Sequence, residues 1–299
     1  MPQIRVSPAI ELAYERDGDP QRPTILLVMG LGLQLTAWPD ELVAGLVARG
    51  FSVLRFDNRD AGLSTQIDAF HPHGLAGALL RGAVGWPIAA PYRLHDMAAD
   101  TVGLLDALGL HQVHVVGVSM GGMIGQIVAA HHPQRVLSLT SIMSTSGARR
   151  LPPPRLQALI ALTRRPPPGA SHQTLVDHYV RLFGVIGSPD QQTPEALLRA
   201  RLHRSFARAF RPEGTARQML AIVATGDRSG ELALITAPTL VIHGTLDPLV
   251  PPAAGRDTAR RIKGAELLMV PGMGHDLPLS RIPMLVDRIA AHCEAASRS

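Results

Sequence analysis

A serine between two glycines is the first residue of the chain whose setting suggests covalent chemistry. It is Ser119 in the sequence GVSMG, which covers residues 117–121 and follows the valine-rich run 113–116. A serine in a tight turn between a strand and a helix exposes its hydroxyl, and the flanking glycines let neighbouring backbone approach without Cβ clashes. The pattern therefore predicts a nucleophilic serine at the edge of a sheet.

A serine hydroxyl does not ionise near neutral pH, so it needs a base for its proton and a carboxylate that orients the base. Asp247 lies in HGTLDPLVP, directly after the apolar run 239–243, and His275 lies in PGMGH, directly after the run 266–270. Because parallel strands all end at one edge of a sheet, we expect Ser119, Asp247 and His275 to converge there as a catalytic triad. Asp276, beside the histidine, we interpret as a helix cap.

A tetrahedral intermediate on the serine would need hydrogen-bond donors for its oxyanion. The backbone N–H of Met120 directly follows the nucleophile, and the N–H of Leu31 lies in the loop that leaves the apolar run 24–29. Gly30 and Gly32 give that loop the freedom to aim its N–H groups. We predict that Leu31 and Met120 form the oxyanion hole.

The elements that position these residues alternate along the chain. Strand-like runs are predicted at 24–29, 51–56, 113–118, 136–143, 239–243 and 266–270, and helices at 39–49, 96–108, 120–130 and 283–296. This alternation predicts an α/β fold, a mostly parallel sheet with helices on both faces. From about residue 145 to 230 the strand-like runs stop and the segment becomes helical and rich in arginine and proline. We expect a core formed by residues 1–144 and 231–299, with a helical cap inserted at 145–230.

Several apolar residues of the expected cap are candidates for a substrate pocket. They either line the pocket together with Gly30 or form the small core of the cap itself, and these residues are Tyr179, Phe183, Phe206, Phe210 and Met219. The order of residues along the chain does not decide between these two possibilities.

A charged loop follows the predicted strand 51–56. Asp57, Arg59 and Asp60 either clamp a substrate or form an ion and hydrogen-bond network that fixes the loop beneath the site. We favour the network.

Composition limits the partners of this chain of 299 residues. Its net charge is +5, but it has no basic run of five residues or more and only 4% of its residues are aromatic, which argues against binding to nucleic acid. The uncharged interval from Asp106 to Arg135 is interrupted by histidines and glycines, so we interpret it as buried sheet and helix, with no membrane span. The first twenty residues lack the apolar segment of a secretory signal, and we expect a cytoplasmic monomer or homodimer.

No metal or other cofactor is expected. The sequence has no pair of histidines at positions i and i+4 that is accompanied by a carboxylate in a repeated helical or loop context, which is the usual pattern of a metal site. The single cysteine, Cys293, has no cluster of cysteines or histidines around it. We therefore interpret Cys293 as a packing residue.

Several motifs together resemble the α/β-hydrolase superfamily over nearly the whole chain. They are GVSMGG, HGTLDPLVP, PGMGH, and LRFDNRDAGLST following LLVMG with WPDEL. The VMG sequence at the predicted oxyanion loop, with the WPDE and RFDNRD segments, is similar to the bacterial subgroup that contains aclacinomycin methylesterase. Met29 stands where much of the superfamily has a histidine, and the subgroup shares this difference. The resemblance implies a cofactor-free esterase with a helical cap over its pocket.

The sequence favours a serine hydrolase that cleaves carboxylic esters through an acyl-enzyme. The expected substrate is a small to medium, apolar ester. Lactonases, carbon–carbon bond hydrolases and cofactor-free perhydrolases use the same triad and remain open, as does a non-catalytic protein that binds a ligand under its cap. Epoxide hydrolases and haloalkane dehalogenases are disfavoured, because they use a carboxylate nucleophile where this chain has Ser119.

Overall fold

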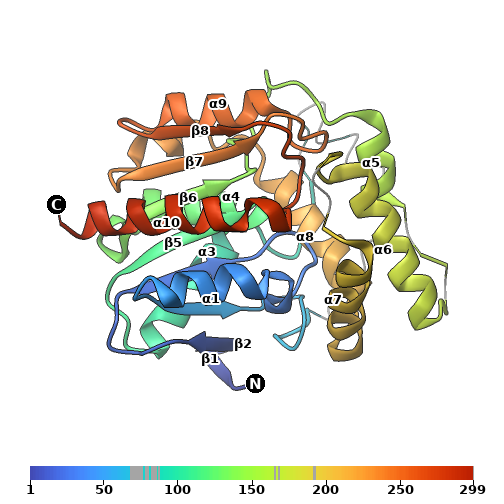
Figure 1. Ribbon diagram of the computed structural model, residues 1–299, viewed down its shortest axis with the longest axis horizontal. Coiled ribbons are helices and arrows are strands. Elements are labelled where there is room, and N and C mark those ends of the chain that lie inside the picture. The colour runs from blue at the N-terminus through green and yellow to red at the C-terminus, as the bar shows by residue number, and fades with distance from the viewer. Residues whose placement is uncertain are drawn as a thin grey trace.

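One sheet forms the centre of the structure, a computed structural model (Figure 1). The structure describes residues 1–67, 88–164, 169–190 and 193–298, together with positions 77, 81, 86, 166 and 167. Within these residues the sheet has eight strands in the order β1-β2-β4-β3-β5-β6-β7-β8. Their bounds are β1 Gln3–Ser7, β2 Ile10–Asp17, β3 Thr24–Val28, β4 Ser52–Phe56, β5 Val113–Val118, β6 Val136–Ile142, β7 Thr239–Gly244 and β8 Glu266–Val270.

The six neighbouring strands β4, β3, β5, β6, β7 and β8 pair in parallel, which confirms the predicted α/β fold. The antiparallel strands β1 and β2 were not predicted. The second half of β2 is charged, so it lacks the apolar run by which the other strands are recognised. Its charges pair across the sheet instead, where the half-buried Glu15 and Asp17 each lie 3.1 Å from the guanidinium of Arg55 on β4.

Helices cover both faces of the sheet. Their bounds are α1 Asp40–Ala48, α3 Leu94–Ala107, α4 Met120–His131, α9 Pro252–Arg261 and α10 Ile282–Ser297. Figure 1 shows α1 and α10 in front of the sheet and α3 and α4 behind it. Strand β3 is buried along its whole length, because Ile25 and Leu27 pack in the cluster with α1 and α10 and Leu26 and Val28 in the cluster with α3 and α4. Cys293 of α10 is fully buried, as predicted, and burial raises the pKa of its thiol to about 12.

Between β6 and β7 the chain leaves the sheet and forms further helices. They are α5 Leu156–Thr163, α6 His172–Ile186, α7 Glu195–Arg208 and α8 Pro212–Thr225, and a short 3-10 helix, η3 Glu231–Leu234, leads back to the sheet. Figure 1 shows these helices grouped at one side of the sheet. They occupy the segment in which the sequence lacks strand-like runs. No helix in the described part of the chain combines the length and the apolar character that crossing a membrane requires.

Two fully buried carboxylates connect these helices to the loop after β4. Asp57 lies 2.6 Å from the guanidinium of Arg208 on α7, and Asp60 lies 2.7 Å from that of Arg217 on α8. Asp60 also accepts a hydrogen bond of 2.7 Å from the hydroxyl of Tyr92, whose pKa is raised by burial. The expected network beneath the site is therefore confirmed.

We predict that replacing Arg217 with methionine lowers the free energy of unfolding by about 3–5 kcal/mol, because a buried carboxylate loses its cation. The control is Arg204→Met, which removes a pair with Asp40 whose side chains are each 59% exposed. That change should cost at most about 1 kcal/mol. Urea denaturation followed by circular dichroism measures both, and equal losses would contradict the role given to the buried pair.

Candidate active site

Ser119 lies in a strained turn between β5 and α4. Its backbone has φ +53° and ψ −117°, a conformation that residues with a side chain rarely adopt and that costs of order 1–3 kcal/mol. Two hydrogen bonds hold the turn: the N–H of Ser119 donates to the carbonyl of Ile142 at 2.9 Å, and the hydroxyl of Ser144 donates to the carbonyl of Ser119 at 2.8 Å. Both partners lie at or just after the end of β6. The neighbouring strand therefore sets the position of the serine.

The two glycines around Ser119 are required by close packing of backbone. A Cβ atom on Gly117 would lie 2.3 Å from the carbonyl oxygen of Gly121, and one on Gly121 would lie 2.0 Å from the carbonyl oxygen of Val28. Real Cβ atoms do not approach this closely. Any larger residue at either position would push α4 away from the ends of β5 and β3.

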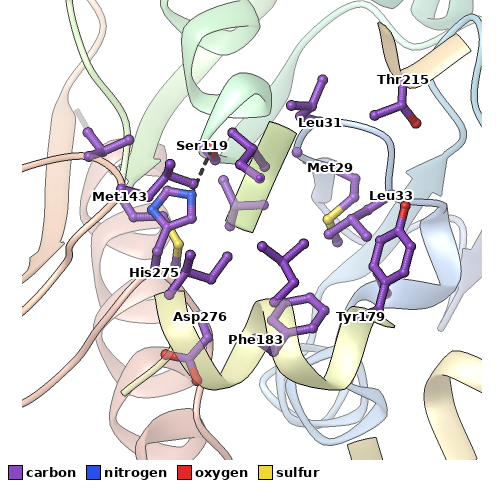
Figure 2. A pocket seen from close by; sticks show the side chains of 18 of the residues that line it. Met29, Leu31, Leu33, Ser119, Met143, Tyr179, Phe183, Thr215, His275 and Asp276 are labelled. Atoms are coloured by element: carbon purple, nitrogen blue, oxygen red, sulfur yellow. Dashed lines mark hydrogen bonds between the residues drawn. The ribbon is translucent and has the colours of Figure 1, made fainter. Parts of the chain in front are cut away.

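The structure brings Ser119, His275 and Asp247 together. The Nε2 atom of His275 lies 3.0 Å from the Oγ of Ser119, and its Nδ1 lies 2.7 Å from Oδ2 of Asp247 (Figure 2 shows the first contact). The other oxygen of Asp247 accepts hydrogen bonds from the backbone N–H groups of Leu249 and Val250, at 2.9 and 2.8 Å. In the tautomer that carries its proton on Nδ1, His275 donates a hydrogen bond from Nδ1 to Asp247, and Nε2 is free to accept the proton of the serine hydroxyl.

The loops that carry the aspartate and the histidine are bonded to each other. The N–H of Thr245 donates to the carbonyl of Val270, and the N–H of Leu246 donates to that of Met273, both at 3.0 Å. His243, next to the last residue of β7, bonds locally, with its Nε2 2.8 Å from the carbonyl oxygen of Val250. The two loops therefore form one unit at the edge of the sheet.

The histidine loop also contacts the end of α6. The N–H of His275 donates to the carbonyl of Ile186 at 2.7 Å, and the N–H of Gly274 donates to the hydroxyl of Ser188 at 2.9 Å. Ser188 in turn donates from its hydroxyl and its N–H to one oxygen of Asp276, at 2.6 and 3.0 Å. Sequence analysis missed Ser188, because 88 residues separate it from its partner.

The interpretation of Asp276 as a helix cap is wrong. Its carboxylate is directed to Ser188, and the short 3-10 helix nearby, η4 Leu279–Arg281, has no side-chain cap. Burial raises the pKa of Asp276, and the hydrogen bonds from Ser188 only partly oppose that effect. Asp276 is therefore a second carboxylate next to the histidine, but the histidine nitrogen is bonded to Asp247.

The predicted oxyanion donors are the N–H groups of Met120, directly after Ser119, and of Leu31, in the loop that follows β3. Met120 is the first residue of α4, where the helix leaves its N–H groups without partners in the helix. Among the described residues, neither N–H donates a hydrogen bond within the chain. The Leu31 loop is fixed on either side, since Asn58 donates to the carbonyl of Met29 at 3.0 Å and the N–H of Gly32 donates to Gln218 at 2.8 Å.

Ser119 and His275 open onto an apolar cavity of about 610 Å³ between the sheet edge and the helices α5 to α8 (Figure 2). Of the candidate pocket residues, five line it: Gly30, Tyr179, Phe183, Phe210 and Met219. Phe206 was wrongly included, because its ring does not reach this cavity. It packs edge-on against the rings of Tyr179 and Phe210, with centroids 5.0 and 5.5 Å apart. Phe206, which is half-buried, is therefore part of an aromatic cluster within the helical segment.

Sequence analysis missed much of the cavity wall. Further apolar residues that line it include Met29, Leu33, Met123, Met143, Leu182 and Leu198. They come from five separate segments, so their spacing along the chain contains no signal of a common surface. The cavity is thus a large apolar space with the Ser119 hydroxyl and the His275 ring on its wall.

Comparisons with known proteins agree with this architecture. The family model described as alpha/beta hydrolase fold matches residues 23–281. The chain is 33% identical to rhodomycin D methylesterase of Streptomyces peucetius, over 96% of each chain. It is 27% identical to 2-hydroxy-6-oxononadienedioate/2-hydroxy-6-oxononatrienedioate hydrolase of Paraburkholderia xenovorans, over 89% of this chain and 84% of that protein. The crystal structure of an enol-lactonase from Burkholderia xenovorans superposes with a TM-score of 0.75 at 26% identity and covers 98% of this chain and 100% of that one.

The resemblance that the motifs indicated is therefore confirmed, both for the superfamily and for the methylesterases within it. The matched region begins just before β3 and ends just before α10, so it includes the turn at Ser119 and the loops of Asp247 and His275. This chain belongs to the α/β-hydrolase family.

Proposed function

We propose that the protein hydrolyses carboxylic esters, with Ser119 as the nucleophile, His275 as the base and Asp247 as the group that orients the base. The observation that carries the proposal is the continuous path of hydrogen bonds from the Ser119 hydroxyl through the imidazole to Asp247, at the wall of an apolar cavity. The methylesterase relatives support the same class of reaction.

In the first half of the reaction, the Ser119 oxygen attacks the carbonyl carbon of the ester while Nε2 of His275 takes the hydroxyl proton. The N–H groups of Met120 and Leu31 donate to the oxyanion of the tetrahedral intermediate. The bond to the leaving alcohol then breaks, and the imidazolium returns its proton to that alcohol. Asp247 holds the imidazole in the required tautomer and stabilises its positive charge.

In the second half, water takes the place of the alcohol. His275 removes a proton from the water, the resulting hydroxide attacks the acyl-enzyme, and a second tetrahedral intermediate forms at the same donors. Its collapse releases the carboxylic acid and returns the proton to the oxygen of Ser119. The reaction consumes one water for each ester.

The cavity supports a substrate of drug-like size. Its volume of about 610 Å³ lies in the usual range of ligand pockets, and its wall is mostly apolar. Two arginines, Arg164 and Arg201, also line it, and the guanidinium of Arg201 is paired with Glu41 at 2.6 Å. We infer that the acid part is apolar and occupies this space under a cap formed by residues 145–230. By analogy with the methylesterase relatives, the alcohol part would be small, with methanol as the first candidate.

A lactone is the second candidate substrate. A lactone is a cyclic ester, so the same attack by Ser119 opens it, and the enol-lactonase neighbour shares the fold over its full length. The leaving alcohol then stays attached to the acyl group, which requires room on both sides of the serine. Parallel assays of methyl esters and lactones of matched acid size therefore decide between the two substrate classes.

We predict that Ser119→Ala lowers kcat by at least about 10³-fold, because no other group can form the acyl-enzyme. Hydrolysis is measured with p-nitrophenyl esters of increasing chain length, methyl esters of bulky apolar acids, and lactones. A fluorophosphonate should label the wild-type protein at Ser119 and leave the variant unlabelled. Retained activity in the variant would refute the mechanism, and an unlabelled wild type would favour a non-catalytic ligand-binding protein.

The two aspartates near the histidine provide a matched test of its orientation. We predict that Asp247→Asn lowers kcat by about 10⁴-fold, because an amide favours the wrong tautomer of His275. Asp276→Asn should keep most of the activity, because the asparagine oxygen still accepts both hydrogen bonds from Ser188. Equal losses in the two variants would contradict the choice of Asp247.

The same Asp276→Asn variant should also change how stability depends on pH. The pKa of Asp276 is raised in the folded state, so folding is less favourable when this carboxyl must be ionised. This destabilisation is present when the pH is above the pKa of Asp276 in the folded state, and it disappears as the pH falls to the ordinary pKa of an aspartate. We therefore predict that the variant melts at a higher temperature than wild type at pH 7.5, and that the difference shrinks towards pH 4. Melting curves of both proteins at each pH measure it, and a difference independent of pH would contradict the prediction.

A further inference from the structure

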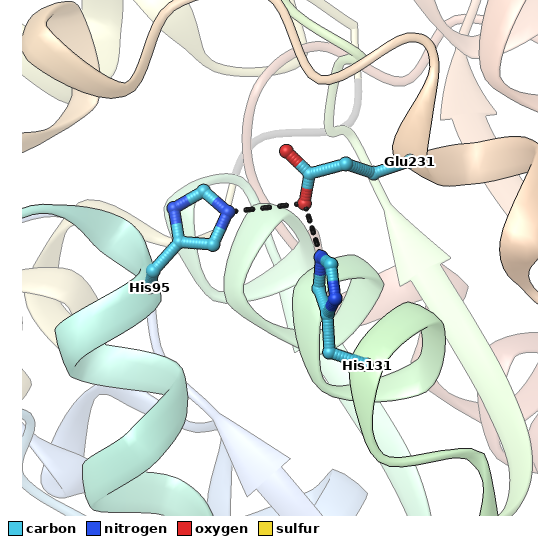
Figure 3. Close-up of side chains that lie close together, drawn as sticks. All are labelled: His95, His131 and Glu231. Atoms are coloured by element: carbon cyan, nitrogen blue, oxygen red, sulfur yellow. Dashed lines mark hydrogen bonds and ion pairs between the residues drawn. The ribbon is translucent and has the colours of Figure 1, made fainter.

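Three potential metal ligands from distant parts of the sequence meet on the surface, away from the cavity (Figure 3). His95 lies in the first turn of α3, His131 is the last residue of α4, and Glu231 is the first residue of η3. Their ligand atoms all lie within 4.8 Å of one another. Sequence analysis expected no metal site, because these residues are separated by 36 and 100 positions and form no short motif.

Both imidazoles direct the same nitrogen to one oxygen. The Nε2 of His95 lies 3.0 Å from Oε2 of Glu231, and the Nε2 of His131 lies 2.8 Å from the same oxygen. Two imidazoles and one carboxylate form a donor set typical of zinc. Tetrahedral zinc with bonds of about 2.0–2.1 Å keeps its ligand atoms about 3.3 Å apart. Each nitrogen–oxygen contact would therefore have to open by a few tenths of an ångström, and the two nitrogens, which lie within 4.8 Å of each other, would have to settle at the same spacing.

The surroundings leave room for an ion and for this small movement. The side chains of His95 and His131 are 44% and 42% exposed, while that of Glu231 is 25% exposed. Solvent therefore reaches the site, and water can occupy the remaining coordination position. Two exposed hydrogen bonds between histidine and glutamate would by themselves contribute little to stability. A surface hydrogen bond between one histidine and one glutamate does not need a second imidazole nitrogen at the same oxygen. The meeting of two Nε2 atoms at Oε2 of Glu231 is therefore the observation that points to a metal ion.

We propose that His95, His131 and Glu231 bind a divalent transition metal ion of the zinc class through Nε2, Nε2 and Oε2. The ion would connect α3 and the C-terminal end of α4 to η3, the first element after the helices α5 to α8. None of the three residues lines the cavity, so the ion takes no part in the chemistry at Ser119. Its effect is on the stability of the fold.

The experiment uses the full-length protein without a histidine tag, treated with EDTA and transferred to metal-free buffer at pH 7.5. Titration calorimetry with ZnCl₂ should show one saturable site. At a zinc concentration about 100-fold above the measured Kd, the melting temperature should rise by about 4 °C. Cobalt(II) in place of zinc should give the strong visible absorption of tetrahedral coordination.

The variants test which residues bind the ion. His95→Gln and His131→Gln should each lose the calorimetric signal and the shift in melting temperature, although glutamine can still donate a hydrogen bond to Glu231. The matched control is His203→Gln, which disrupts another close histidine pair, His172 and His203, whose stacked rings have centroids 5.0 Å apart. This control should bind zinc like wild type.

Two results would overturn the proposal. One is the absence of saturable zinc binding to the wild type in the calorimetric titration. The other is loss of binding in His203→Gln with binding retained in His131→Gln, which would place the ion on the helical segment. Neither result depends on whether the protein cleaves esters.

Discussion

The contact between the start of α4 and the end of β3 is the constraint on which the site depends. Gly121 lies directly against the carbonyl of Val28, where even a Cβ atom would come within 2.0 Å. This contact brings the first turn of α4 next to the loop that leaves β3, which carries Leu31. It also forces the chain at Ser119 into its strained turn. The exposed hydroxyl and the two candidate donors for the oxyanion thus have one structural cause, the packing of backbone against backbone.

The buried charged side chains near the apolar cavity have partners. An uncompensated buried charge would be strongly destabilising, and the fully buried carboxylates of the loop after β4 are each paired with an arginine. The half-buried carboxylate on the cavity wall, Asp276, is held by hydrogen bonds from Ser188. Asp57 and Asp60 bind arginines of α7 and α8, and Arg59 binds Asp100 of α3 at 2.6 Å. The helices over the cavity are therefore attached to the core by ionic contacts at their base. The wall above these contacts remains free for an apolar ligand.

Sequence alone predicts those features that depend on local pattern or on a shared sheet edge. The parallel strands are visible as apolar runs, and Ser119, Asp247 and His275 each follow such a run, so their convergence follows from the fold. Strand β2 was missed because its charges are neutralised by Arg55 on a neighbouring strand. Phe206 and Phe210 have the same residue type and lie four positions apart, yet only Phe210 reaches the cavity. Phe206 lies in the last turn of α7, whereas Phe210 lies beyond the end of α7 at Arg208, in the link to α8. Spacing along the chain does not show where the helix ends and the chain turns towards the cavity.

The histidine loop connects the helical segment to the chemistry. His275 is bonded through its N–H to Ile186 at the end of α6, and a Cβ atom on Gly274 would lie 2.4 Å from the backbone of Gly187. The loop is also bonded to the segment after β7 that carries Asp247. A rigid opening of α6 away from the sheet would break the hydrogen bonds to the loop and displace the imidazole from Ser119. The geometry therefore favours access for the substrate along a route that leaves the C-terminal end of α6 in place, with movement confined to the helices that the loop does not touch.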